Sequence, residues 1–201
     1  MRDRFKFPLS KEETYHYLLA ALQAEVAFRH REFIMNDEVE NQLNQLASWL
    51  SSDTSEFGVL LCGGCGNGKS SIMKAFQQLL NAMQIPNNYT KKPWGMRIVD
   101  AMYITDLCKN NYKEYLNLSK VEMLGIDDLG IEPYEIVDYG NKFYPVVDLL
   151  SKRYEEQLFT FVTTNMTPGQ IRERYHDRIA DRLNEMMKII VYKNATFRKP
   201  Q

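Results

Sequence analysis

A glycine-rich stretch directly after an apolar run carries the residues best suited to chemistry. It has the spacing Gly-x-x-x-x-Gly-Lys-Ser of a P-loop. Its residues are Gly63, Gly64, Cys65, Gly66, Asn67, Gly68, Lys69, Ser70 and Ser71. In a P-loop, backbone N–H groups and the start of the following helix surround the phosphates of a nucleotide. All nine residues are therefore predicted to bind nucleotide, with Lys69 on the β- and γ-phosphates and the Ser70 hydroxyl on Mg²⁺.

A second apolar run ends in two carboxylates, which P-loop chemistry requires. Residues 121–128 read Val-Glu-Met-Leu-Gly-Ile-Asp-Asp, so Asp127 and Asp128 end a predicted strand. Asp127 is expected to hold the Mg²⁺ shell, and Asp128 to orient or deprotonate the attacking water. The alternative for both residues is an ordinary acidic turn.

Recognition of guanine is not expected. Residues 127–130 fit the Asp-x-x-Gly pattern of GTPases, but a GTPase should also carry an Asn-Lys-x-Asp motif. The nearest segment, residues 141–144, reads Asn-Lys-Phe-Tyr and lacks the final aspartate.

Three further polar residues are candidates for catalysis. Asn165 follows the apolar run 159–164, at the carboxyl end of a predicted strand, where ligands bind in α/β folds. It is expected to bond the γ-phosphate or to hold the water; the alternative is a turn cap. Arg178 and Arg182 lie four residues apart on one face of a helix predicted to start at the cap Thr167. Taken alone they are typical of a solvated surface, but in a P-loop ATPase either is a candidate arginine finger for a neighbouring subunit.

The elements that position these residues are visible as hydrophobic patterns. Ser10 and Glu13 form a capping-box pattern at the start of one predicted helix, and a second helix is predicted from Asn36 or Asp37 to Leu50. Five short apolar runs then alternate with helical stretches. They are Phe57–Cys62, Met96–Val99, Val121–Ile126, Leu158–Thr163 and Met187–Tyr192. Such runs are typical of buried strands in a parallel α/β sheet.

The composition fits a globular protein. The 201 residues include 25 basic and 26 acidic ones, a net charge of -1 that neither favours nor excludes nucleic acid. No apolar run approaches the roughly 18 residues of a membrane span, and the first residues lack the apolar core of a signal peptide. A cytoplasmic protein without membrane contact is therefore expected. Cys62, Cys65 and Cys108 lack a second pair for zinc and are expected to be free.

Four motifs, in their order and spacing, resemble the DnaC/IstB group of AAA+ ATPases. They are GGCGNGKSS, VEMLGIDDLG, FVTTNMT and YHDRIADRLNEM. That group contains bacterial helicase loaders and the ATPase helpers of transposition. The resemblance implies a P-loop NTPase fold of the AAA+ type, α/β with three layers and a five-stranded parallel sheet. This core is expected at residues 33–201, after a helical extension at residues 1–32.

The resemblance also implies cofactors, partners and residue roles. It implies ATP and Mg²⁺ held between the subunits of an ATP-dependent homo-oligomer, with Asn165 as the sensor-1 residue. Arg182 aligns best with the family's arginine finger, and Arg178 is the second candidate. The family binds single-stranded DNA and acts with a replicative helicase or a transposase. The function predicted is ATP hydrolysis in replication or transposition; the alternatives are a nucleotide-gated binding module with little hydrolysis and a P-loop small-molecule phosphotransferase.

The chain departs from the family's pattern in three places. Asp128 stands where many AAA+ proteins have glutamate. Only about ten residues follow the last predicted strand, so the helical lid is expected to be absent, with Arg198 as a weak substitute for its arginine. Residues 100–120 are expected to be too short for the additional helix with which loaders contact DNA.

Basic and aromatic residues nevertheless interleave in that segment, a pattern found on surfaces that bind single-stranded DNA. The residues concerned are Lys109, Tyr112, Lys113 and Tyr115. An ordinary surface helix is the commoner explanation of this pattern.

Overall fold

The computed structural model describes residues 5–88, 90–138, 140–193 and 197. The chain folds into two compact units. Unit 1 consists of residues 1–54, 64–96 and 192–201, and unit 2 consists of residues 55–63 and 97–191. The boundary expected between residues 32 and 33 stays a prediction.

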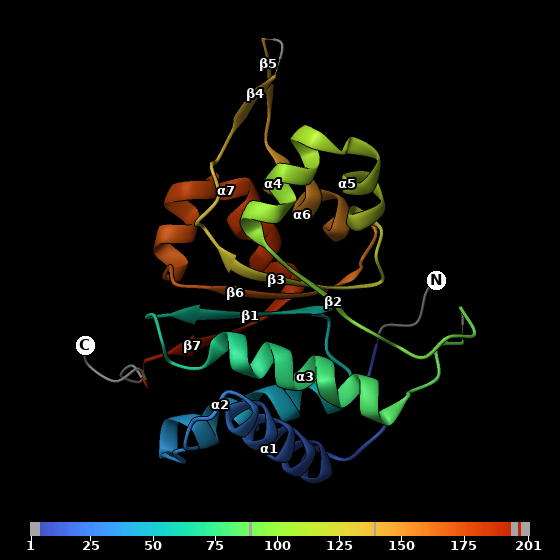
Figure 1. The fold of residues 1–201 in the computed structure, drawn as a ribbon, viewed down its shortest axis with the longest axis vertical. Helices are drawn as coiled ribbons and strands as arrows, with labels where there is room; N and C mark the ends of the chain where they lie inside the picture. The colour runs from blue at the N-terminus through green and yellow to red at the C-terminus, as the bar shows by residue number, and fades with distance from the viewer. Residues whose placement is uncertain (1–4, 89, 139, 194–196, 198–201) are drawn as a thin grey trace. The chain divides into compact units, whose positions relative to one another are not determined.

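Three helices build unit 1 (Figure 1): α1 Lys11–Phe28, α2 Asp37–Ser51 and α3 Lys69–Met83. Helix α1 packs against both α2 and α3. The buried carboxylate of Glu25 on α1 accepts hydrogen bonds from Arg29 Nε and from Gln78 Nε2 of α3, each at 2.7 Å. This contact helps to fix α3, whose first turn belongs to the P-loop motif.

Side-chain caps set the starts of α1 and α2. Ser10 Oγ accepts from the Glu13 N–H, and the Glu13 carboxylate accepts from the Ser10 N–H, which completes the predicted capping box. Asn36 Oδ1 accepts from the Val39 N–H at 2.9 Å. Both predicted helices are therefore confirmed.

A five-stranded parallel sheet forms the centre of unit 2 (Figure 1). In their order along the sheet the strands are β2 Arg97–Asp100, β3 Met123–Leu129, β6 Phe159–Thr164, β1 Gly58–Gly63 and β7 Met187–Tyr192. All five predicted strands are confirmed, with ends that differ by a few residues. Every residue of β1 and β6 is buried, as expected for strands that read as continuous apolar runs.

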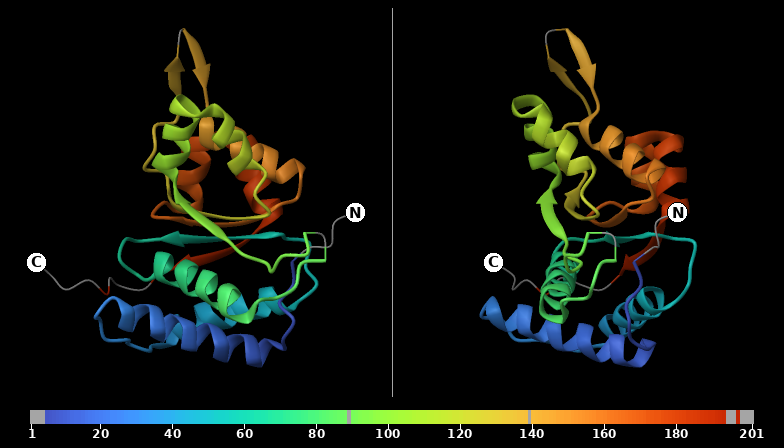
Figure 2. Two further views of the ribbon diagram at one scale, coloured as in Figure 1. Left: turned by 45° about the vertical axis from the view of Figure 1, so that its right-hand side comes forward. Right: turned by 90° about the vertical axis from the view of Figure 1, so that its right-hand side faces the viewer.

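The four helices of unit 2 lie on the same face of this sheet (Figure 1 and Figure 2). They are α4 Ala101–Asn110, α5 Tyr112–Ser119, α6 Pro145–Glu155 and α7 Pro168–Met186. The steps from β2 to β3, β3 to β6 and β6 to β7 all run in one direction along the sheet. Crossovers between parallel strands are right-handed, so steps in one direction place their helices on one face.

Residues 100–120 differ from the prediction, because they hold two helices, α4 and α5, where no additional helix is expected. The segment is long enough because both helices are short. Of its interleaved residues, Tyr115 is buried, and its hydroxyl donates to Pro145 O at 2.8 Å. Tyr115 is therefore unavailable to a base, whereas Lys109, Tyr112 and Lys113 are exposed.

A β-hairpin between β3 and α6 is absent from the predicted elements. Its strands, β4 Ile136–Asp138 and β5 Asn141–Phe143, pair antiparallel and project from the rest of unit 2 (Figure 1). Strands of three residues are too short to produce the alternating pattern from which a strand is predicted.

After β7 the structure describes Lys193 and Phe197, neither of them in a helix, and Arg198 lies outside the described residues. The expected absence of a lid stays a prediction. Among the described helices none is both long and apolar enough to cross a membrane.

Candidate functional site

The P-loop motif leaves β1 at Gly63 and enters α3 at Lys69. Gly66 and Gly68 have φ angles of 80° and 94°, in the region that residues with a side chain rarely adopt. Gly68 is also the N-cap residue of α3, and no side chain caps this helix. The start of α3 thus offers its backbone N–H groups and the positive end of the helix dipole, which suits a phosphate.

Lys69 is held inside the loop by two oxygen acceptors. The side chain is buried, and Nζ donates to Gly64 O at 2.6 Å and to Asn67 Oδ1 at 2.9 Å. Both acceptors belong to the motif, so the loop itself positions the ammonium. Cys65 is exposed, and Ser70 and Ser71 are half-buried.

Phe197 also contacts the motif. Its N–H donates to Gly66 O at 2.9 Å, and its Cε2 lies 4.0 Å from where a Cβ on Gly68 would stand. Sequence reasoning misses this residue, because a backbone N–H donor leaves no signal in residue type or spacing.

The two candidate site carboxylates, Asp127 and Asp128, lie in a β-bulge of unit 2. The pairing of β3 with β6 shifts register between Ile126 and Leu129, and Asp128 has φ 55°. Thr163 Oγ1 of β6 donates to Asp127 Oδ1 at 2.5 Å and accepts from the Asp128 N–H at 3.0 Å. The prediction that both carboxylates end the strand is confirmed, but sequence reasoning misses Thr163.

Asn165 directly follows β6 and is exposed. The preceding Thr164 Oγ1 donates to Leu129 O at 2.6 Å and accepts from the Met166 N–H at 3.1 Å. The first of these bonds joins the carboxyl ends of β3 and β6, which are neighbours in the sheet. Unit 2 therefore brings Asp127, Asp128 and Asn165 to the side of the sheet at which the parallel strands have their carboxyl ends, as predicted.

A buried carboxylate connects this edge to α7. Glu132 accepts from the Gly130 N–H at 2.8 Å and from the Tyr175 hydroxyl, and Arg174 Nη2 donates to its backbone oxygen. Burial, together with the negative charge of Glu132, raises the pKa of Tyr175. The loop after the two aspartates is therefore tied to the helix that carries Arg178 and Arg182.

Helix α7 is divided by a kink at His176, where φ is 64° and ψ is 168°. This conformation is almost restricted to glycine. Arg172 bridges the kink, because its guanidinium pairs with Asp177 at 2.5 Å and with Asp181 at 2.7 Å. Arg178 and Arg182 both lie in the second arm, so the prediction that they share a helix holds.

The two arginines have different surroundings. Arg182 lies 3.3 Å from Glu155 and 5.0 Å above the ring of Tyr154, with only 17% of its side chain exposed. Arg178 is exposed and has no ion pair or hydrogen bond among the residues that the structure describes. Arg182 is thus engaged within its own chain, whereas Arg178 is available to another molecule.

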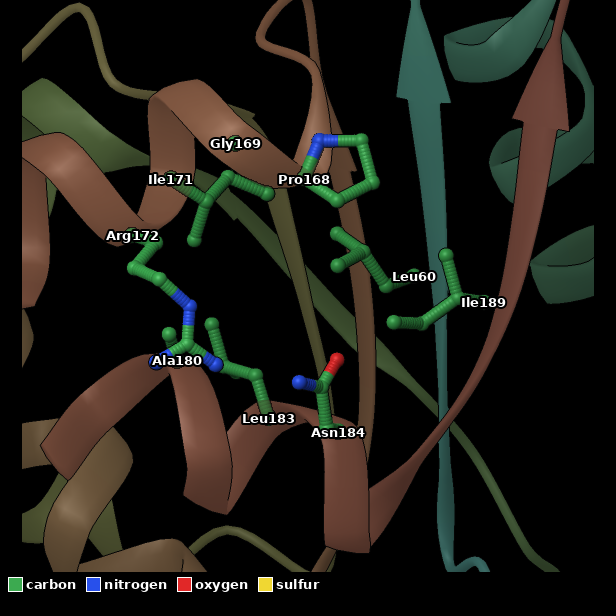
Figure 3. A pocket seen from close by; sticks show the side chains of 9 residues that line it. All are labelled: Leu60, Pro168, Gly169, Ile171, Arg172, Ala180, Leu183, Asn184 and Ile189. Carbon is green, nitrogen blue, oxygen red and sulfur yellow. The ribbon is translucent and has the colours of Figure 1, made fainter. Parts of the chain in front are cut away.

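A cavity of about 170 Å³ lies between the two arms of α7 and strands β1 and β7. Figure 3 shows Leu60 and Ile189 on the strand side and Arg172 extending from one arm of α7 toward the other. None of the predicted site residues lines this cavity. It is therefore separate from the edge of the sheet that carries Asp127 and Asp128.

The described residues contain no group of three or more His, Cys, Asp or Glu side chains that could hold a metal ion by themselves. A Mg²⁺ ion that enters with a nucleotide has a different requirement, because phosphate oxygens and waters supply most of its ligands. The Ser70 hydroxyl and the Asp127 carboxylate are oxygen ligands of the kind that Mg²⁺ prefers. The donor chemistry at both residues therefore fits the predicted ion.

Several solved structures share this architecture. The DnaC helicase loader superposes with a TM-score of 0.63 at 18% identity, covering 89% of this chain and 99% of the other. DnaI gives a TM-score of 0.63 at 20% identity, over 91% and 93% of the two chains. The replication initiator DnaA, bound to AMPPCP and single-stranded DNA, gives 0.53 at 13% identity, over 79% of this chain and 48% of the other. The chain has the AAA+ fold.

The AAA+ fold confirms the predicted class, an α/β P-loop NTPase with a five-stranded parallel sheet, and the resemblance to the DnaC type at the level of structure. No family model matches the sequence, and no curated protein matches it significantly. At 18–20% identity the likeness to DnaC and DnaI extends to the fold alone.

Proposed function

We propose that this protein is an ATPase of the AAA+ type that binds ATP with Mg²⁺ and acts in DNA replication or transposition. The observation that carries the proposal is the form of the P-loop. Gly66 and Gly68 adopt left-handed conformations, α3 starts without a side-chain cap, and Lys69 is held inside the loop. The fold shared with helicase loaders supports the assignment to replication.

The residues of the P-loop and of the carboxyl ends of β3 and β6 each receive a role in this proposal. The backbone of residues 63–71 and the Lys69 ammonium bind the phosphates, and Ser70 and Asp127 hold Mg²⁺. When bound, Mg²⁺ neutralises charge on the β- and γ-phosphates. Asp128 orients or deprotonates the attacking water, and Asn165 senses the γ-phosphate.

The direct test compares Lys69→Ala with the wild-type protein for ATP binding and phosphate release. Removal of a preorganised charged donor is expected to lower turnover by about 10²-fold or more, with weaker ATP binding. Lys74→Ala is the matched control, because Lys74 lies on the same helix and has no ion pair among the described residues. Normal turnover in Lys69→Ala would contradict the proposal.

A nucleotide-gated binding module is the second candidate, and the short side chain of Asp128 favours it. Asp128 sits in a bulge with φ 55°, a conformation that aspartate tolerates better than most residues. Its side chain is one methylene shorter than the glutamate of many AAA+ proteins. Binding of ATP with negligible phosphate release, with and without single-stranded DNA, would select this candidate. Transfer of phosphate to a small molecule would instead select a phosphotransferase.

The proposed partners are a second copy of this chain, single-stranded DNA, and a replicative helicase or a transposase. Exposed Lys109, Tyr112 and Lys113 on α4 and α5 support a DNA contact, since aromatic and basic side chains together bind single strands. The exposure of Arg178 supports contact with the nucleotide of a neighbouring copy.

A further inference from the structure

Thr163 lies near the carboxyl end of β6 and is fully buried. Its hydroxyl makes two hydrogen bonds to β3, both to residues that the proposed reaction uses. Oγ1 donates to Asp127 Oδ1 at 2.5 Å and accepts from the Asp128 N–H at 3.0 Å. One small side chain thus contacts both acidic residues.

The direction of these two bonds follows from their donors. A threonine hydroxyl has one proton, and a backbone N–H can only donate. Since the Asp128 N–H donates to Oγ1, the hydroxyl proton is left for Asp127 Oδ1. Thr163 therefore orients the Asp127 carboxylate as an acceptor while it holds the backbone of Asp128.

The backbone at this point needs such support. The pairing of β3 with β6 shifts register between Ile126 and Leu129, and Asp128 has a positive φ of 55°. Strained bulge residues keep their conformation only where surrounding contacts fix them. The Asp128 N–H lies inside the bulge, and the Thr163 hydroxyl supplies an acceptor for it.

We propose that Thr163 is a positioning residue whose hydroxyl sets the Mg²⁺ affinity of the nucleotide-bound protein by fixing Asp127 and Asp128 in the bulge. This inference rests on the proposed function, because it assigns Asp127 to Mg²⁺. Residues that orient metal ligands through hydrogen bonds typically change metal affinity by about 10- to 100-fold when replaced.

The test uses Thr163→Val, which keeps the shape but removes the hydroxyl, and Thr163→Ser, which retains it. The Mg²⁺ concentration for half-maximal phosphate release is measured at saturating ATP. It is expected to rise about tenfold or more in Thr163→Val and to return close to the wild-type value in Thr163→Ser. Thr105→Val is the matched control, because Thr105 is a buried threonine of α4 whose hydroxyl donates to Ala101 O.

A second readout needs no nucleotide. Hydrogen exchange of the Asp128 amide, followed by NMR, is expected to be faster in Thr163→Val than in the wild type and unchanged in Thr105→Val. If Thr163→Val does not fold, Thr163→Cys, which replaces the hydroxyl with a weak donor, takes its place in both measurements.

The two readouts separate the failure of this inference from that of the proposed function. An unchanged Mg²⁺ midpoint in Thr163→Val, or an effect that Thr163→Ser does not reverse, would overturn the positioning role. A wild-type protein without Mg²⁺-dependent turnover would contradict the proposed function, and amide exchange at Asp128 alone would then decide whether Thr163 holds the bulge.

Discussion

Arg178 and Arg182 are one helical turn apart, yet only one of them is free to reach a second molecule. The resemblance to the DnaC/IstB group implies that Arg182 is the arginine finger. In the structure Arg182 pairs with Glu155 and lies over the Tyr154 ring, whereas Arg178 is exposed. An arginine that acts in trans must release its own contacts first, so the geometry favours Arg178.

We expect Arg178→Ala to lower phosphate release by about 10³-fold while ATP binding stays near the wild-type value. Arg182→Ala is expected to lower turnover less and to reduce the free energy of unfolding by about 1 kcal/mol, because it removes a cation–π contact and an ion pair. Turnover assays, nucleotide titration and urea denaturation of both variants measure these effects. If Arg182→Ala abolishes turnover without a loss of stability, the finger is Arg182.

At the scale of elements, the parts of the fold set by local signals were predictable. The side-chain caps at Ser10, Asn36 and Thr167 act within three residues, and the structure confirms a helix start at each. The five apolar runs gave the five strands, because burial of whole strands leaves a continuous pattern.

The hydrogen bonds that complete the candidate site could not be predicted from local sequence patterns. Thr163 and Asp128 are 35 residues apart, and Glu132 and Tyr175 are 43 apart. A threonine in an apolar strand and a glutamate in a loop have no pattern that reveals a distant partner. The kink at His176 could not be predicted either, because no glycine or proline lies at that position.

Arg153 also makes contacts that no local sequence pattern predicts. It is fully buried on α6, and its guanidinium donates to four oxygen atoms, none from a carboxylate. The acceptors are Thr160 Oγ1, Ser119 O, Val121 O and Phe159 O. Burial lowers the pKa of Arg153 to about 9, so it stays charged at neutral pH. The side chain joins α6 to the starts of β3 and β6.

Arg153→Met is expected to reduce the free energy of unfolding by about 3 kcal/mol or more, because it leaves buried carbonyl groups without their donor. Arg153→Lys is expected to recover only part of this loss, since one ammonium cannot reach all four acceptors. Urea denaturation followed by tryptophan fluorescence measures both effects. Lys152→Met, at the half-buried neighbouring position, serves as the control and is expected to change stability by less than about 0.5 kcal/mol.

At the scale of the whole molecule, buried tyrosines make stability depend on alkaline pH. Burial raises the pKa of Tyr115, Tyr175 and Tyr192 above the usual value of about 10. A raised pKa in the folded state means that the folded protein holds protons which the unfolded chain releases. Their stabilisation is therefore complete below pH 10 and is lost as the pH rises above it.

Between pH 10 and 11 each tyrosine is expected to contribute a loss of about 1 kcal/mol, because an unfolded tyrosine is only half-ionised at pH 10. Arg153 acts in the opposite direction, because its folded pKa is lowered, and it offsets one of the three. The net loss between pH 10 and 11 is thus about 2 kcal/mol, measurable by urea denaturation. Tyr192→Phe is expected to reduce this slope, whereas Tyr17→Phe, at an exposed tyrosine, is the control. A slope unchanged by Tyr192→Phe would contradict the assignment.

The proposed ATP-dependent association of several copies of this chain can be tested directly. The net charge of -1 gives little electrostatic repulsion between copies, and the exposed guanidinium of Arg178 is available to an anionic group of another copy. Light scattering with and without a non-hydrolysable ATP analogue is expected to show larger particles only when the analogue is present.

Arg178→Ala is expected to weaken this assembly more than Arg182→Ala does, because the first removes a contact between copies and the second a contact within one chain. Assembly without nucleotide, equal in all variants, would indicate an interface that does not involve the ATP site. A monomer in every nucleotide state, at high protein concentration, would remove the argument for an arginine finger. ATP would then act on a single copy, as in a nucleotide-gated binding module.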